Sequence, residues 1–117
     1  MPEKKLNGQT ALVTGANSGI GEGVAIALGE AGANVVINYV ANEASANAVV
    51  EKIKSFGSSA IAINADVRKE AEVANLFKQT IDTFGTVDIL VNNAGLQRDA
   101  KFHEMTLAQW QLVIDVN

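Results

Sequence analysis

The sequence predicts an α/β fold in three layers, with a parallel sheet covered by helices on both faces. Short apolar runs alternate with longer amphipathic segments, at a repeat of about thirty residues. The apolar runs are nearly continuous, which is typical of parallel strands that are buried on both faces. Right-handed crossovers then give the strand order 3-2-1-4, with a ligand crevice where the first strand meets the fourth.

Four apolar runs of strand length predict the sheet. The second of them, Asn34 to Tyr39, is rich in β-branched residues and too short for a helix. The helices between the runs return the chain to the same end of the sheet, so that the strands are parallel. The expected strands are residues 10–13, 34–39, 59–65 and 87–91.

Three amphipathic segments predict the helices that cross between these strands. The first follows a glycine-rich turn and ends near Gly32. The second is capped by Asn42 and ended by Gly57, and the third runs from about Glu70 to Gly85. The residues expected on their buried faces are Ile20, Val24, Ala27, Leu28 and Ala31; Ala46, Val49, Val50, Ile53 and Phe56; and Val73, Leu76, Phe77, Ile81 and Phe84.

A fourth helix is expected after a polar loop over residues 92–103. Thr106 and Gln109 have the spacing of a capping box at its start. The residues that follow on this helix are Leu107, Trp110, Val113, Ile114 and Asn117. No linker or low-complexity tract interrupts the chain, so we expect one domain over residues 1–117.

Composition excludes several classes of function. The chain has 13 acidic and 9 basic residues and no basic run, so neither nucleic acid nor a membrane surface is an expected partner. It has no cysteine, which excludes disulfides and thiolate chemistry, and we expect no metal site. We find no signal-peptide core and no apolar run of membrane-spanning length, so a cytoplasmic location is expected.

The turn after the first strand reads Thr-Gly-Ala-Asn-Ser-Gly-Ile-Gly and has the pattern of a nucleotide cradle. Gly15 allows a sharp turn, Gly19 removes a Cβ that would hold off a pyrophosphate, and Gly21 lets the helix lie close to the sheet. The helix that follows offers free N–H groups and the positive end of its dipole to phosphates. Taken alone, the glycines fit an ordinary surface turn equally well.

Polar residues follow all four strands, and together they resemble a known family. After the glycine turn come Tyr39, then Asp66 with Val67, and then Asn-Asn-Ala-Gly at residues 92–95. In this order they resemble the short-chain dehydrogenase/reductase family, whose members bind NAD or NADP on a Rossmann-type sheet. The family pattern Thr-Gly-x-x-x-Gly-x-Gly is matched by Thr14, Gly15, Gly19 and Gly21. The resemblance covers essentially the whole chain.

The resemblance implies a set of cofactor contacts. The backbone of the turn from Gly15 to Gly21 would bind the phosphates. Asp66 would accept a hydrogen bond from the adenine amino group, with the backbone of Val67 beside it. The residues implied as cofactor-binding are Thr14, Gly15, Asn17, Ser18, Gly19, Ile20, Gly21, Tyr39, Asp66, Val67, Asn93, Ala94 and Gly95. A carboxylate that caps the third helix is the alternative for Asp66.

The asparagine pair and Tyr39 also have two interpretations each. Asn93 would lie under the adenosine ribose and Asn92 would brace the fourth strand, but asparagine is also a common turn residue. Tyr39 stands where members that prefer NAD place an acid, and no Arg or Lys is at Ser18 or residues 40–42 to bind a 2′-phosphate. NAD and NADP therefore both remain candidates, with Tyr39 either near the adenosine or simply buried.

The catalytic residues of the family are largely missing. Its members use an Asn-Ser-Tyr-Lys tetrad, of which only Asn117 is matched, and no Tyr-x-x-x-Lys occurs here. His103 is the single histidine and is expected in a solvated or capping role. We therefore expect the cofactor half of a truncated short-chain dehydrogenase, which does not turn over by itself.

Within the family, residues 35–39, 92–96 and 103–105 resemble bacterial glucose 1-dehydrogenases. This implies hydride transfer between nicotinamide and an alcohol or sugar. Two alternatives are a non-catalytic dinucleotide-binding module and a structural half that requires a partner chain. The second has a physical motive, because the last strand and the helix around Trp110 would leave an open edge and an apolar face for self-association. A homo-oligomer is therefore expected.

Overall fold

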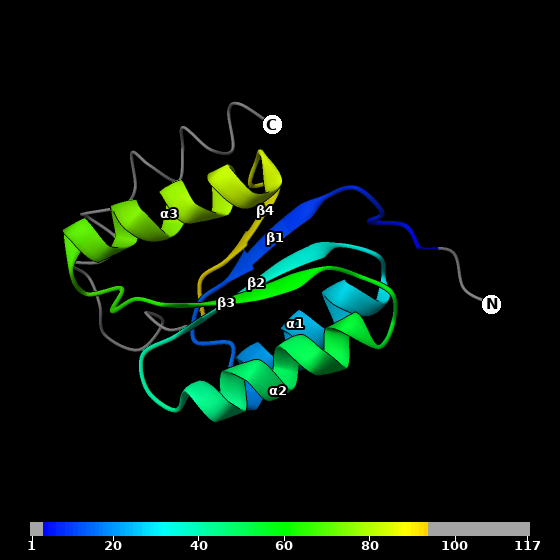
Figure 1. Cartoon of the computed structure of the whole chain (residues 1–117), viewed down its shortest axis with the longest axis horizontal. Coiled ribbons are helices and arrows are strands. Elements are labelled where there is room, and N and C mark those ends of the chain that lie inside the picture. The colour runs from blue at the N-terminus through cyan, green and yellow to red at the C-terminus, as the bar shows by residue number, and fades with distance from the viewer. Residues whose placement is uncertain (1–3, 94–117) are drawn as a thin grey trace.

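The computed structural model describes residues 4–93 and confirms the predicted fold class (Figure 1). The elements in chain order are β1 (Thr10–Val13), α1 (Gly19–Glu30), β2 (Asn34–Tyr39), α2 (Glu43–Lys54), β3 (Ala60–Asn64), α3 (Glu70–Phe84) and β4 (Ile89–Val91). The strands form one parallel sheet in the order β3-β2-β1-β4, as predicted. β1 and β2 have the predicted bounds, whereas β3 and β4 are each two residues shorter than the predicted runs 59–65 and 87–91.

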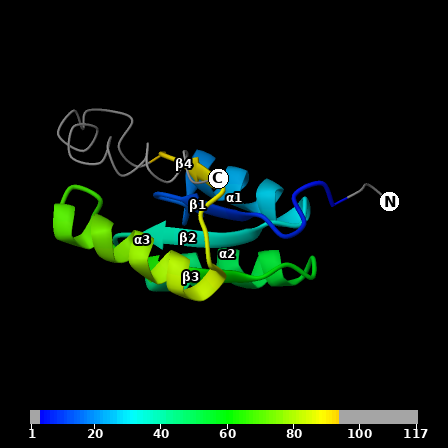
Figure 2. The same ribbon diagram turned by 90° about the horizontal axis from the view of Figure 1, so that it is seen from above.

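Helices cover both faces of the sheet (Figures 1 and 2). α1 and α2 lie on one face and α3 lies on the other. In β1, Ala11 and Val13 pack into the core beneath α1 and α2, while Leu12 packs into the core beneath α3. Alternate side chains of β2 are divided between the same two cores, which explains why the strands read as continuous apolar runs.

The buried face of α1 differs from the prediction. Ile20 is 80% exposed and Ala27 is also exposed, while Gly21, Ala25 and Gly29 are buried. The reason is close packing: a Cβ on Gly29 would lie 2.6 Å from Cγ2 of Ile53 on α2. The helix therefore turns its smallest residues inward. Of the predicted face, Leu28 packs half-buried against the same core, so the prediction is wrong for Ile20 and Ala27 and not for the whole face.

The other two helices follow the prediction more closely. In α2 the buried residues Ala46, Val49, Val50 and Ile53 all belong to the predicted face, with Phe56 half-buried beyond the end of the helix. In α3 the buried residues are Val73, Leu76, Phe77 and Thr80.

One predicted core residue of α3 is replaced by a polar neighbour. Ile81 is 43% exposed, and Thr80 is fully buried in its place. The Thr80 hydroxyl donates to the Leu76 carbonyl at 2.8 Å, so the buried hydroxyl has a hydrogen-bond partner. Gly85 ends the helix as predicted, with φ of 88° and its N–H bonded to the Ile81 carbonyl.

Several predictions concern residues that the structure does not describe. These are the loop after Asn93, the capping box of Thr106, the helix around Trp110, and the site residues Ala94, Gly95, His103 and Asn117. Within residues 4–93, none of the helices is both long enough and apolar enough to cross a membrane.

Candidate functional site

The predicted site residues gather at the carboxyl edge of the sheet, where β1 lies between β2 and β4. The helix that leaves β1 covers one face, and the helix that precedes β4 covers the other (Figure 2). Parallel sheets bind ligands at such a switch point. Thr14, the first residue after β1, is bonded through its N–H to the Val91 carbonyl at 3.0 Å.

The turn from Thr14 to Ser18 has the backbone that its glycines permit. Gly15 and Gly19 both have φ of 59°, a left-handed conformation that favours glycine. A Cβ on Gly19 would meet no atom within 4 Å, so the space beside it is open. Ile20, the next residue, is also exposed.

Gly21 is required by neighbours within the site itself. A Cβ at this position would collide with the Gly15 carbonyl oxygen and would lie 2.7 Å from Nδ2 of Asn93. The prediction gave Gly21 the role of bringing the helix close to the sheet. The atoms that exclude a side chain belong to the glycine turn and to Asn93, two residues after β4.

Asn38 holds the turn and was missed by the sequence analysis. Its side chain is fully buried; Oδ1 accepts from the Gly15 N–H at 3.2 Å, and Nδ2 donates to the Ala65 carbonyl at 3.0 Å. Its backbone carbonyl accepts from the Ala16 N–H. One amide therefore joins the turn after β1 to the end of β3. The feature of the sequence that could have identified Asn38 is its carboxamide side chain in an otherwise apolar strand, because a buried polar group needs hydrogen-bond partners.

The asparagine pair after β4 is attached to the same turn. The Asn93 N–H donates to Thr14 Oγ1 at 2.9 Å, and its Nδ2 donates to the Gly15 carbonyl at 3.1 Å. Thr14 Oγ1 also lies 3.4 Å from Oδ1 of Asn92. Nδ2 of Asn92 is buried and has no hydrogen-bond partner among residues 4–93. Thr14 and Asn93 are thus brought together, whereas a contact of either with a cofactor stays a prediction.

The side chains of Asn17 and Ser18 differ in their hydrogen bonding. The Asn17 side chain donates to the Ala41 carbonyl at 3.0 Å and to Ser45 Oγ at 2.9 Å, so it ties the turn to the start of α2. Ser18 is exposed at the N-cap position of α1, but its side chain makes no capping hydrogen bond. The first N–H groups of a helix have no partner within the helix, so this end is suited to an anion.

Asp66 lies between β3 and α3 and is bound by Arg68. Oδ1 accepts from the backbone N–H and Nε of Arg68, and Oδ2 accepts from Nη2, each at 3.0 Å. These bonds from Arg68 lower the pKa of the Asp66 carboxyl from 3.8 to about 2. The N-cap of α3 is Lys69, so the alternative of a helix-capping carboxylate is wrong.

Tyr39 and Val67 are both buried beside this loop. Tyr39 packs with the core on the α1 and α2 face, and its carbonyl accepts from the Ala65 N–H. Val67 packs with the core on the α3 face. Within residues 4–93, no three His, Cys, Asp or Glu side chains are grouped so that they could hold a metal ion.

A left-handed glycine turn before a helix N-terminus, at the switch point of a parallel sheet, is typical of the doubly wound α/β class, whose members bind nucleotides at this edge. The sequence model of the short chain dehydrogenase family matches residues 9–117. The chain therefore belongs to the short-chain dehydrogenase family.

Individual relatives agree with this assignment. A 3-oxoacyl-acyl-carrier-protein reductase of Synechocystis sp. is 48% identical over 96% of this chain and 45% of its own length. Glucose 1-dehydrogenase 2 of Bacillus subtilis is 44% identical over 97% of this chain, again 45% of its own length. A short-chain dehydrogenase structure from Burkholderia cenocepacia, in complex with NADP, has a TM-score of 0.76 and 36% identity, and the match covers 96% of this chain and 50% of that one. The chain spans about half the length of these relatives.

Proposed function

We propose that residues 1–117 form the NAD(P)-binding domain of an oxidoreductase that transfers hydride between nicotinamide and an alcohol or carbonyl carbon. The observation that carries this proposal is the turn from Thr14 to Ser18. Two left-handed glycines lead to a helix N-terminus that Ser18 does not cap, and the space beside Gly19 is open. A pyrophosphate supplies the charge and the acceptors that such an end favours.

The residues present fit a dinucleotide along this edge. Backbone N–H groups of residues 17–21 would hold the pyrophosphate, because those of Gly15 and Ala16 already donate to Asn38. Asn38 and Asn93 keep the turn in shape. Asp66 and Val67 would receive the adenine, with Tyr39 near the adenosine. Asn93, Ala94 and Gly95 would lie under its ribose. When bound, the cofactor supplies or accepts the hydride.

We propose that this chain binds the cofactor without turning over a substrate. Its single tyrosine is Tyr39, which is followed four residues later by Glu43 rather than lysine. No tyrosine–lysine pair is therefore available to exchange a proton with the alcohol, a step commonly worth about 100- to 10,000-fold in rate. Asn117 remains the one proposed catalytic residue of this chain.

Two substrate classes are supported by relatives of similar identity. The 44% identity to a glucose 1-dehydrogenase favours a small alcohol or sugar hydroxyl. The 48% identity to a 3-oxoacyl-acyl-carrier-protein reductase favours a 3-oxoacyl thioester. A sugar and an acyl thioester differ in charge and length, so assays with both on a full-length relative of this chain would separate them.

Two other functions are compatible with the same site: a dinucleotide-binding module without chemistry, and a structural half that pairs with another chain or with a second copy. β4 pairs only with β1 among the described strands, which leaves an edge for such pairing. A monomer at micromolar concentration by analytical ultracentrifugation would argue against the second function. A soluble cytoplasmic location fits either one.

The primary test is calorimetric titration of the 117-residue chain with NAD and NADP separately. We expect saturable binding that Gly19→Asp weakens by at least about tenfold, because the new carboxylate occupies the open space and repels phosphate. Gly8→Asp is the matched control, since Gly8 has φ of 88°, is also open around its Cβ, and precedes β1. Equal weakening by both variants, or no binding by the wild-type chain, would contradict the proposal.

A further inference from the structure

The carboxylate of Asp66 has one acceptor position left. An ionised carboxylate offers about four lone-pair positions. Arg68 fills three of them, two on Oδ1 and one on Oδ2, through its backbone N–H and two atoms of its guanidinium fork. One position on Oδ2 therefore carries no hydrogen bond from any residue between 4 and 93.

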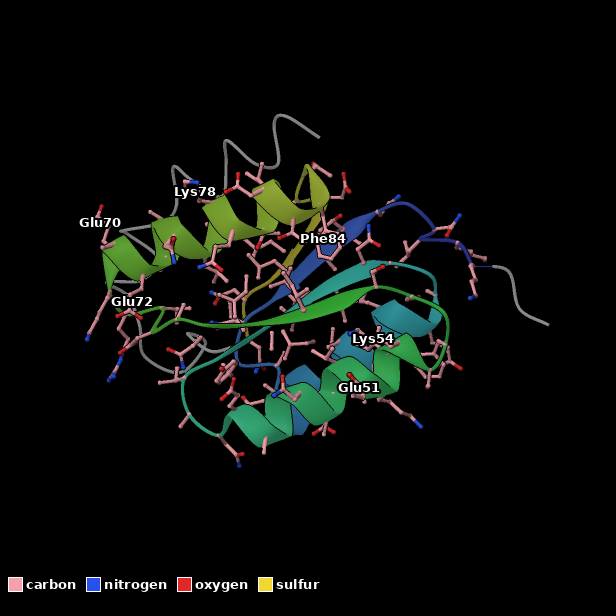
Figure 3. All side chains as sticks on the ribbon, in the orientation of Figure 1. Glu51, Lys54, Glu70, Glu72, Lys78 and Phe84 are labelled. Atoms are coloured by element: carbon pink, nitrogen blue, oxygen red, sulfur yellow. The ribbon has the colours of Figure 1, made fainter. Side chains whose placement is uncertain are left out.

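The loop around this carboxylate is fixed on both sides. The N–H of Asp66 donates to Oε1 of Glu72 at 2.7 Å, from the first turn of α3 (Figure 3). The carbonyl of the preceding Ala65 accepts from the buried Asn38 at 3.0 Å. With the backbone held in place, the remaining freedom of the Asp66 side chain is rotation of its carboxylate, and the fork of Arg68 removes that freedom.

We propose that Arg68 is a positioning residue for purine recognition: it fixes the Asp66 carboxylate so that one open acceptor position on Oδ2 meets the amino group of a 6-aminopurine. This inference rests on the proposed function. A carboxylate that only accepts would attract the N–H of adenine and repel the carbonyl oxygen of a 6-oxopurine. Arg68 would thus set the selectivity for adenine through Asp66, without touching the base.

The exposure of the pair separates this role from a structural one. The Arg68 side chain is 71% exposed and that of Asp66 is 15% exposed. Ion pairs with an exposed partner contribute little to folding. Loss of the guanidinium should therefore leave the fold intact while it frees the carboxylate to rotate.

The test compares NAD with its analogue that carries hypoxanthine in place of adenine, both titrated calorimetrically into the 117-residue chain. The wild-type chain should prefer NAD by roughly tenfold or more, the usual value of a hydrogen bond to a charged group. Arg68→Met should bring this preference close to one by weakening NAD alone. Lys78→Met removes the same charge from an exposed pair further along α3 and should leave the preference unchanged (Figure 3).

Arg68→Lys separates charge from geometry, because lysine keeps the charge but has no rigid fork. It should recover only part of the preference. Full recovery would show that charge alone acts and would overturn the positioning role, as would an unchanged preference in Arg68→Met. If the wild-type chain binds both dinucleotides equally, this inference is wrong and the proposed function stands; if it binds neither, both are wrong.

Discussion

α1 and α2 are two helices of 12 residues on the same face of the sheet, yet their N-termini are built in opposite ways (Figure 1). α2 begins after Asn42, whose Oδ1 accepts from the Ser45 N–H at 3.1 Å. α1 begins after Ser18, whose side chain caps nothing. The first N–H groups of a helix need acceptors. α2 supplies one from its own cap, whereas the side chain at the N-cap of α1 supplies none.

The buried faces of the two helices also differ, in the size of the side chains that they carry. α2 buries Val49, Val50 and Ile53, whereas α1 buries two glycines and Ala25. Ile53 fills the space that a side chain on Gly29 would need. α2 thus supplies the bulk of this core, and α1 supplies close approach to the turn and the sheet. α1 adds the partly buried Ile26 and Leu28 to this core, but none of its large apolar residues is fully buried.

The largest effect is expected from filling the close approach of α1. In Gly21→Ala the new Cβ would collide with the Gly15 carbonyl, which is backbone and cannot move aside cheaply. We expect the free energy of unfolding to fall by about 3 kcal/mol, together with loss of NAD binding. Urea denaturation followed by circular dichroism measures the first quantity, and calorimetry measures the second.

Gly23→Ala is the matched control on the same helix. Gly23 is exposed and open around its Cβ, so alanine should stabilise the helix by about 0.5 to 1 kcal/mol. If both alanines have the same effect, α1 does not depend on close approach at Gly21, and the contrast with α2 loses its structural basis.

The second prediction concerns the caps themselves. Asn42→Ala removes the only side-chain cap of α2 and places alanine at φ of 70°, so the free energy of unfolding should fall by about 1 to 2 kcal/mol. Ser18→Ala should change it by less than about 0.5 kcal/mol, because no hydrogen bond is lost. Both are measured by urea denaturation without ligand.

Asn42→Gly separates the cap from the backbone strain, since glycine adopts this φ freely and should cost only a few tenths of a kcal/mol. A loss from Ser18→Ala as large as that from Asn42→Ala would show that α1 is capped in solution. The proposed role of its N-terminus as an open anion site would then fail.

The sequence predicted those parts of the molecule that follow from local chemistry. The bounds of β1 and β2, the cap at Asn42 and the glycine end of α3 at Gly85 each depend on a few adjacent residues. The strand order followed from right-handed crossovers. These features need no knowledge of which residues meet across the fold.

The features that were missed depend on contacts between distant segments. The inward face of α1 is set by Ile53 from another helix, and periodicity favoured Ile20 instead. Asn38 stands among apolar neighbours, and only the fold shows that its amide bridges the turn at Gly15 and the end of β3. Asp66 lies just beyond the end of β3, as its position in the sequence indicates, but its pairing with Arg68 was not predicted.

The smallest change in the free energy of unfolding is expected at the start of α3. The N-cap of this helix, Lys69, makes no side-chain cap hydrogen bond. An ion pair between Asp66 and Arg68 holds the loop before it. The pKa of Asp66 is lowered from 3.8 to about 2 in the folded chain. The folded state therefore binds this proton less readily than the unfolded state does. The stabilisation is fully present above pH 3.8 and is lost as the pH falls toward about 2.

Urea denaturation of wild type and Arg68→Met across that pH range tests this linkage. The gap between their free energies of unfolding should be small, because Arg68 is largely exposed, and it should close as the pH falls. The gap between wild type and Asn42→Ala should stay constant over the same range, since an amide does not titrate there. If the Arg68→Met gap also stays constant, the Asp66 carboxylate is not held by the guanidinium in solution.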